Sequence, residues 1–220
     1  MKFPISVNLI VRNEEDRLRL LLPILDEYFD EIIAVDQDST DDTVYVLDEY
    51  AHQILSDKAT GYADSSRQLA LDSSSNKWIL TIDADEVPTH RFIKDMGEFI
   101  NADYGIDAEY RDLREHSIIC CVADVEPTAK LLPYEIVMQY GDTYPLPKHK
   151  SIRMQTRLVR KENLLINDHL HGGVGIKDGT TCLYWHYNGI IQFKTIAERV
   201  RSDTRYLAVE LGKYDPDIHL

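Results

Sequence analysis

WILTIDADEV, residues 78–87, joins an apolar, β-rich run to three carboxylates, Asp83, Asp85 and Glu86. The apolar run is long enough for one buried strand. Because alternate side chains of a strand share a face, Asp83 and Asp85 are expected to point to the same side, with small Ala84 between them. Two carboxylates this close repel each other, and Mg²⁺ or Mn²⁺ is the natural counter-charge for oxygen ligands. The stretch alone favours solvated acids at a strand end, so only its context can favour a metal site.

Strands and helices alternate through the first half of the chain. Apolar runs at 5–11, 31–36 and 53–55 predict strands, and a helical spacing of apolar residues follows each of them. This order predicts an α/β fold with a Rossmann-like, mostly parallel sheet flanked by helices. Such sheets bind ligands at the carboxyl ends of their strands. Because Asn13, Asp36 and Asp83 all follow strand ends, we expect them to converge on one crevice.

Capping residues predict where the first two helices begin. Asn13 is a good N-cap for a helix that runs to Tyr28, and Pro23 inside that pattern predicts a kink or an early break. Ser39 or Thr40 is expected to cap the second helix.

The second half of the chain has a less regular pattern. Its predicted elements are strands at 118–125, 134–140 and 181–187 and a helix at 192–211. The last strand is expected to end at His186, and Gly212 is expected to stop the helix. We therefore predict one continuous domain, with a larger half at 1–117 and a smaller, C-terminal half at 118–220.

Composition indicates an ordinary globular protein. Hydrophobic residues make up 44% and charged residues 28% of the 220 positions, which argues against disorder. The net charge of -14 argues against a surface generally suited to DNA. The three cysteines have no disulfide or metal-binding spacing, and no run has the length of a membrane span or the form of a signal peptide. We therefore predict a cytoplasmic protein, with a peripheral position at the inner membrane face left open.

A basic run extends from Lys148 to Lys161 and contains six lysines or arginines and no acid. A solvated basic face explains such a run, and so does contact with a phosphate or another polyanion. Both interpretations stay open at this point.

Four segments together resemble the GT-A fold glycosyltransferases of family 2. They are VNLIVRNEE at 7–15, EIIAVDQDSTDDTV at 31–44, Arg67 and the DAD of TIDADE at 81–86. Their order and spacing agree with that family over roughly the first 100 residues. GYADSSRQLAL at 61–71 and the dipeptide His186–Tyr187 are similar to the lipopolysaccharide core glucosyltransferase-like group. The second half of the chain matches only loosely.

The resemblance implies roles for individual residues. The nucleotide would lie on the first turn and on the tip of the second strand, although Gln37 and Asp38 depart from the usual pattern there. The divalent metal would be held by Asp83, Asp85 and His186. A cation for the leaving group would come from Arg67 or from the C-terminal helix. The predicted nucleotide-sugar contacts are Val11, Arg12, Asn13, Glu14, Asp36, Asp38, Arg67, Asp83, Ala84 and Arg199.

The resemblance also implies the reaction. It predicts inverting, single-displacement transfer of a sugar, most simply from a UDP-sugar, to a hydroxyl of a glycan or lipid-linked acceptor. The acceptor must give up a proton to a nearby base. Our candidate is Asp168, with His169 and His171 behind it, and Arg67 completes the predicted catalytic set.

Three other functions are compatible with parts of the sequence. A nucleotidyltransferase would need a Gly-rich phosphate loop after the first strand, and VRNEED at 11–16 has no glycine. A glycosyltransferase that modifies hydroxymethylated bases of phage DNA is supported only by the basic run. A non-catalytic protein that binds a sugar nucleotide is disfavoured by the intact DAD.

Overall fold

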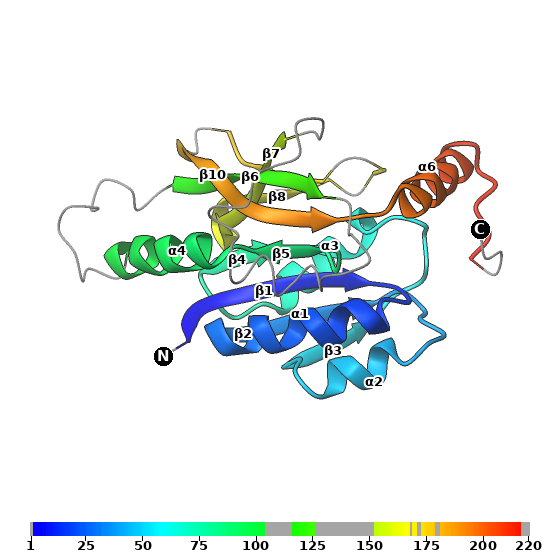
Figure 1. The fold of residues 1–220 in the computed structure, drawn as a ribbon, viewed down its shortest axis with the longest axis horizontal. Helices are drawn as coiled ribbons and strands as arrows, with labels where there is room; N and C mark the ends of the chain where they lie inside the picture. Colours follow the sequence, from blue (N-terminus) through cyan, green and yellow to red (C-terminus); the bar gives the residue numbers. More distant parts are fainter. Residues whose placement is uncertain are drawn as a thin grey trace.

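The protein is described from a computed structural model, which covers residues 2–103, 116–125, 152–167, 169–170, 173–178 and 181–216. Within them, one eight-stranded sheet carries helices on both faces (Figure 1). Its strands are β1 (Phe3–Val11), β2 (Phe29–Asp36), β3 (Gln53–Ser56), β4 (Trp78–Thr81), β5 (Glu86–Pro88), β6 (His116–Val125), β7 (Ile152–Arg160) and β10 (Thr181–Phe193). The helices are α1 (Glu15–Tyr28), α2 (Thr43–Asp48), α3 (Asp64–Ser73), α4 (His90–Asp103) and α6 (Ile196–Glu210). A second, two-stranded sheet pairs β8 (Leu164–Ile166) with β9 (Val174–Ile176).

The order of strands across the large sheet is β3-β2-β1-β4-β7-β6-β10-β5. The pairs β3–β2, β2–β1, β1–β4 and β6–β10 are parallel, whereas β7 and β5 run antiparallel to their neighbours. The predicted α/β fold with a mostly parallel sheet is therefore confirmed. Because Val11 pairs with Asp36 at the last position of β1 and β2, these two strands end together.

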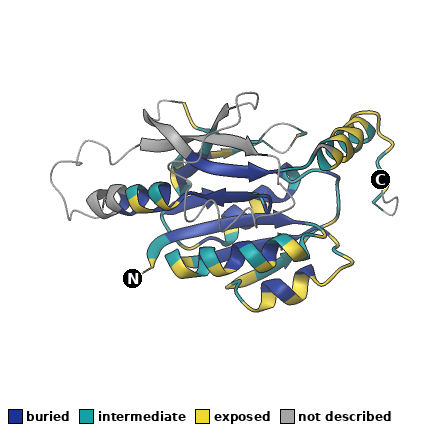
Figure 2. Ribbon diagram, viewed as in Figure 1, coloured by how far each residue is buried: buried dark blue, intermediate teal, exposed yellow. Residues whose placement is uncertain are grey.

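Alternate residues of the central strands supply two cores. Leu9 and Val11 pack with α1, α2 and α4 on one face, and Ile10 packs with Ala70 of α3 on the other. Both sets are buried, as expected of parallel strands covered by helices on both faces of the sheet (Figure 2). The sheet is therefore rigid where its strand ends must hold functional side chains.

The start and the course of α1 differ from prediction. Asn13 does not cap the helix, because its backbone is left-handed (φ 54°) and its side-chain oxygen accepts a hydrogen bond from Thr40 N at 2.7 Å. Glu14 is the N-cap instead. The helix continues through Pro23, where a missing hydrogen bond costs about 3 kcal/mol, because its four buried leucines stabilise it against the sheet.

Within the described residues, the basic run does not form the exposed face that we considered. Much of it is strand β7, in which Arg157 and Arg160 are buried. Arg160 lies over the ring of Trp78 at 5.5 Å, and Lys161 Nζ donates to Ser74 O at 2.7 Å. Residues 148–151 lie outside the described residues. In its described part, the run therefore makes internal contacts rather than a surface for a polyanion.

β10 is longer than predicted. It passes His186 and ends at Phe193, and its pairing with β6 shifts register around Asn188. The last two residues of this strand were assigned to the following helix in our prediction. That helix, α6, begins after a capping box of Thr195 and Glu198, and Gly212 (φ 64°) follows its end as expected.

The division at 117/118 falls inside β6, and the sheet interleaves strands from both halves. None of the helices in the described part of the chain is both long and apolar enough to cross a membrane.

Candidate active site

A cleft of ≈ 910 Å³ opens where β1, β4 and β10 end. The turns after β1 and β4 line it, together with α6 and the segment that follows α6. Of the predicted nucleotide-sugar contacts, all except Asp36 and Asp38 line this cleft, together with Asp85. The structure therefore brings most of the predicted residues to one place, as the strand-end argument required.

The first turn is fixed by the loop after β2. Asn13 N donates to Ser39 Oγ at 2.9 Å, and Glu14 N donates to Thr43 Oγ1 at 2.8 Å. Asp36 accepts a hydrogen bond from Ser39 N at 3.2 Å through Oδ2. Asp36 thus has one buried carboxylate oxygen, Oδ1, without a hydrogen-bond partner among the described residues, but Asp36 does not line the cleft.

Gln37 and Asp38, the two departures from the family pattern, both have structural uses. The Gln37 amide is buried and donates to Ser66 Oγ at 2.7 Å and to Tyr62 O at 3.1 Å, which ties β2 to the start of α3. Asp38 has a left-handed backbone (φ 55°), the conformation in which glycine is least strained. Its carboxylate accepts a hydrogen bond from Ala59 N at 3.2 Å. These internal hydrogen bonds explain the positions of both side chains without any contact to a ligand.

Asp83 and Asp85 belong to a turn between β4 and β5 rather than to a strand. β4 ends at Thr81, and Glu86 N donates to Asp83 O at 3.0 Å across the turn. The expectation that strand alternation aligns the two carboxylates is therefore wrong. Asp83 is directed to Arg67, whereas Asp85 is directed to the end of β10.

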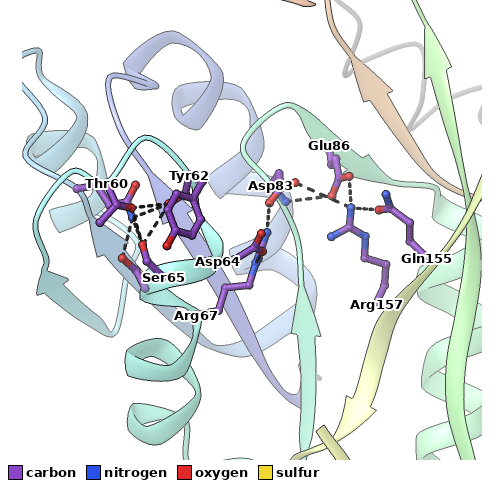
Figure 3. A network of polar contacts seen from close by, with 11 residues as sticks. Thr60, Tyr62, Asp64, Ser65, Arg67, Asp83, Glu86, Gln155 and Arg157 are labelled. Atoms are coloured by element: carbon purple, nitrogen blue, oxygen red, sulfur yellow. Dashed lines mark hydrogen bonds and ion pairs between the residues drawn. The ribbon is translucent and has the colours of Figure 1, made fainter. Parts of the chain in front are cut away.

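Arg67 links Asp83 to the start of α3. Its Nη2 donates to Asp83 Oδ1 at 3.0 Å and its Nε donates to Asp64 Oδ1 at 2.8 Å (Figure 3). Burial acts to raise the pKa of Asp83, but the charges of Arg67 and Arg157 outweigh it and lower the pKa below its ordinary value. Arg67 is itself held positively charged, because these carboxylates raise its pKa despite burial. Asp83 is therefore neutralised by arginine in this structure.

Asp85 has a different environment. Gln192 Nε2 lies 3.1 Å from both carboxylate oxygens, and Lys194 Nζ lies 3.9 Å from Oδ2. Burial, and then the charge of Asp83, raise the pKa of Asp85 above its ordinary value. A divalent ion would relieve this penalty, and Mg²⁺ is commonly bound by one or two carboxylates plus substrate phosphates. Asp85 and the adjacent amide of Gln192 offer oxygen ligands, and the open cleft leaves room for phosphates and water, so the site fits such an ion.

Glu86 and Arg157 form a buried pair behind the turn, which the sequence did not reveal. Arg157 Nη2 donates to Glu86 Oε1 and to Gln155 Oε1, and it lies 4.0 Å from Asp83 Oδ2 (Figure 3). Glu86 Oε2 accepts a hydrogen bond from Asp83 N at 3.0 Å. Burial raises the pKa of Glu86 to about 8 against the attraction of Arg157. The pair therefore connects β7 of the second half to the acidic turn of the first.

Residues 6–110 match the sequence profile of Glycosyl transferase family 2. This part of the chain belongs to that family of glycosyltransferases. An uncharacterized glycosyltransferase of Rickettsia prowazekii, RP128, is 32% identical over 200 residues, covering 84% of this chain and 60% of the relative. Another, RT0209 of Rickettsia typhi, is 33% identical over 103 residues, covering 47% of this chain and 35% of the relative. The chain thus spans only part of the length of these relatives.

Solved structures support the same fold. S. aureus TarS in complex with UDP has a TM-score of 0.54 at 15% identity, covering 100% of this chain and 67% of that chain. TarS in complex with UDP-GlcNAc has a TM-score of 0.54, covering 88% of this chain and 59% of that chain. Likeness at this identity shows the shared GT-A fold, while the lipopolysaccharide core subgroup stays a prediction.

The candidate site residues that we predicted in the second half of this chain have separate outcomes. Asp168 and His171 lie outside the described residues, and His169 is exposed. Arg199 lines the cleft from α6. His186 does not lie at the carboxyl end of its strand, because β10 continues to Phe193. We predicted His186 as a metal ligand because we expected it at the end of its strand. In the structure, Gln192 lies near that end instead.

Arg12 also has partners that the sequence did not predict. Its guanidinium donates to Tyr214 Oη, and to Pro216 O at 2.7 Å, both in the segment after α6. The same segment packs on Gly61, whose φ of 89° favours glycine. A Cβ atom at Gly61 would lie 2.6 Å from Val209 Cγ2 and 3.0 Å from the Tyr214 ring. The C-terminal segment is therefore fitted closely against the side of the cleft that Arg12 and Gly61 line.

Gly61→Ala is expected to lower the free energy of unfolding by about 1–3 kcal/mol more than Gly212→Ala, as measured by urea denaturation. Both glycines have positive φ, so both alanines are strained, but a Cβ at Gly212 meets nothing within 4 Å. The difference therefore isolates the overpacking of α6 and its following segment. Equal losses in the two variants would contradict the close fit.

Proposed function

We propose that the protein transfers a sugar from a nucleoside-diphosphate sugar to an acceptor hydroxyl, with a divalent metal at Asp85. One observation carries the proposal: Asp85 lies in a cleft that is also lined by the first turn, Val11 to Glu14, of a family 2 domain. The cleft is large enough for a nucleotide and a sugar, since ligand pockets of drug-sized molecules measure about 300–1,000 Å³.

The residues of the cleft fit the demands of the leaving group. Departure of the sugar leaves a diphosphate with new negative charge, which positive groups must stabilise as it develops. A bound metal would supply part of that charge. Lys194 lines the same cleft and is close enough to Asp85 to reach a diphosphate bound there. Arg67 is engaged by two carboxylates, so we assign it to holding Asp83 rather than to contact with the leaving group.

For the donor we propose a UDP-sugar. The support is the likeness in fold to S. aureus TarS, which has been solved with UDP-GlcNAc and with UDP. Asn13, Arg12 and Asp36 are the residues proposed to contact the nucleoside. Arg12 already donates hydrogen bonds to Tyr214 and Pro216. For Arg12 to contact the nucleotide base, these hydrogen bonds must be shared with the base or exchanged for bonds to it.

For the acceptor we propose a hydroxyl of a glycan or a lipid-linked glycan, attacked with inversion. The proposed base is Asp168, supported by His171, in the second half of the chain. This assignment rests on the family pattern alone. The modification of DNA bases gains nothing from the structure, since the described part of the basic run makes internal contacts.

Calorimetric titration with UDP, GDP and dTDP, each with and without Mn²⁺, tests the proposal. We expect UDP to bind more tightly with Mn²⁺, and Asp85→Ala to weaken that binding more than about 100-fold, beyond the 10–100-fold typical of outer-shell substitutions. Asp26→Ala is the control, because Asp26 pairs with Lys2 on the surface of α1. If no nucleotide binds, or if Mn²⁺ and Asp85 have no effect, the proposed function is wrong.

A further inference from the structure

Gln192 and Asp85 are held face to face by the backbone. Gln192 pairs with Glu86 in the antiparallel ladder of β10 and β5, and Phe193 N donates to Asp85 O at 2.7 Å. These contacts connect the last two residues of β10 to Asp85 and Glu86. The position of the amide relative to the Asp85 carboxylate is therefore set by the sheet rather than by a flexible loop.

The Gln192 side chain is buried and aimed at the metal position. Its Nε2 lies 3.1 Å from Asp85 Oδ1 and 3.1 Å from Oδ2. A glutamine carries its oxygen and its nitrogen on the same terminal carbon, so a half-turn of the amide exchanges the two atoms. With Asp85 free of metal, the nitrogen faces the carboxylate as a donor. With a cation on Asp85, the oxygen is the atom that the cation attracts.

We propose that Gln192 supplies its amide oxygen as a second protein ligand to the divalent ion on Asp85. The inference rests on the proposed function, because it assumes that the ion binds there with the donor diphosphate. Carboxylate and amide oxygens are ligands that Mg²⁺ and Mn²⁺ accept, and substrate phosphates and water complete the shell. Gln192 then takes the place that the sequence suggested for His186.

The course of β10 places His186 far from this ion. Six residues separate His186 from Gln192 along the strand. β6 advances only four residues, from Cys120 to Asp124, while β10 advances from Trp185 to Gln192, so at about 3.3 Å per residue His186 lies roughly 12 Å before Gln192 along the sheet. A ligand from the end of β10 must therefore come from a residue near its last position.

Lys194 is the competing source of positive charge. Its ammonium group lies 3.9 Å from Asp85 Oδ2 and would repel an ion bound between Asp85 and Gln192. The side chain is partly exposed and can turn toward the diphosphate in the cleft. If it instead remains on Asp85, Lys194 itself replaces the metal and Gln192 has no coordinating role.

Mn²⁺ binding followed by electron paramagnetic resonance, in the presence of saturating UDP, tests the inference without measuring catalysis. We expect Gln192→Ala to weaken Mn²⁺ binding at least as much as the loss of an outer-shell partner does, which is about 10–100-fold, and Gln192→Glu, which retains an oxygen at this place, to bind Mn²⁺ at least as tightly as wild type. The control is Gln68→Ala on α3, whose amide bonds Asp72 on the surface and should leave binding unchanged.

The outcomes separate this inference from the proposed function. Wild-type affinity for Mn²⁺ in Gln192→Ala overturns the role of Gln192 and leaves the nucleotide site intact. Loss of Mn²⁺ in both Gln192→Ala and Gln192→Glu also overturns it, because a simple change of packing would explain both. UDP binding that needs no metal and is lost in Lys194→Ala assigns the charge to Lys194. If wild type binds neither UDP nor Mn²⁺, the proposed function itself fails.

Discussion

Arg67→Met is expected to lower the free energy of unfolding by about 3–5 kcal/mol at neutral pH. Arg67 is buried, and its guanidinium bonds both Asp64 and Asp83. Methionine has a similar length but carries no charge, so the variant leaves two carboxylates in the lining of the cleft without their shared cation. Urea denaturation followed by circular dichroism measures the loss.

The loss should shrink as the pH falls. In the wild type, the pKa of Asp83 lies below its ordinary value of 3.8, so the pairing stabilises the fold above that pH and ceases to do so as pH falls through the folded-state value. Once Asp83 is protonated, the loss of its partner Arg67 matters little. We therefore expect the difference between wild type and Arg67→Met to become smaller as the pH falls below about 3.8, compared with the difference near pH 7.

Arg19→Met is the matched control for Arg67. Arg19 bonds Glu15 one turn away on the exposed surface of α1. Exposed pairs of this spacing contribute little to stability, so the control should be almost as stable as wild type. A loss in Arg67→Met no larger than that in Arg19→Met would show that Asp64 and Asp83 do not depend on the arginine.

The sequence predicted the first half of the molecule well because its signals are local. β1 and β2 are rich in apolar residues and are buried on both faces, and each is followed at once by polar residues, so their carboxyl ends could be located within a residue or two. The convergence of Asn13 and Asp83 on one edge then followed from the geometry of a parallel sheet. Local caps were less reliable, because Asn13 and Thr40 bond to each other across two loops.

The second half was harder to predict because its decisive contacts are long-range. β7 contains Arg157 and Arg160, which are both buried. In the sequence alone, a strand that alternates charged and apolar residues looks the same as a solvated basic segment, because the partners of its arginines are not visible. β10 contains Asn188 and Gly189, a typical turn dipeptide, yet the sheet absorbs it as an irregularity in the pairing with β6. Nothing local to Gln192 indicates that Asp85, 107 positions away, is its partner.

The buried pair of Glu86 and Arg157 joins the two halves of the chain, so a substitution in it should have a large effect on stability. Glu86 is fully buried, and Arg157 Nη2 is its cationic partner. Arg157→Met is expected to destabilise the protein by about 3–5 kcal/mol, because it leaves a buried carboxylate without its counter-charge. The loss should be greatest above the pKa of Glu86, about 8, since below that pH a proton already neutralises the carboxylate.

A double-mutant cycle shows whether this effect belongs to the pair. Glu86→Met combined with Arg157→Met removes both charges and replaces them with apolar groups, a change that is often nearly neutral for buried ion pairs. We therefore expect the double variant to be more stable than Arg157→Met alone, by at least about 2 kcal/mol in urea denaturation near pH 9. Simple additivity of the two single losses would show that the residues act independently.

The stable double variant then separates stability from function. Glu86 also accepts the hydrogen bond of Asp83 N, and Arg157 lies within 4.0 Å of the Asp83 carboxylate, so the pair fixes the acidic turn as well as joining β7 to it. If fixing the turn is its role, the folded double variant should bind UDP with Mn²⁺ about 10–100-fold more weakly than wild type, because the turn that carries Asp85, the proposed metal ligand, loses its support. Binding at wild-type strength would limit the pair to stability, and Asp85 would then owe its position to β5 and β10 alone.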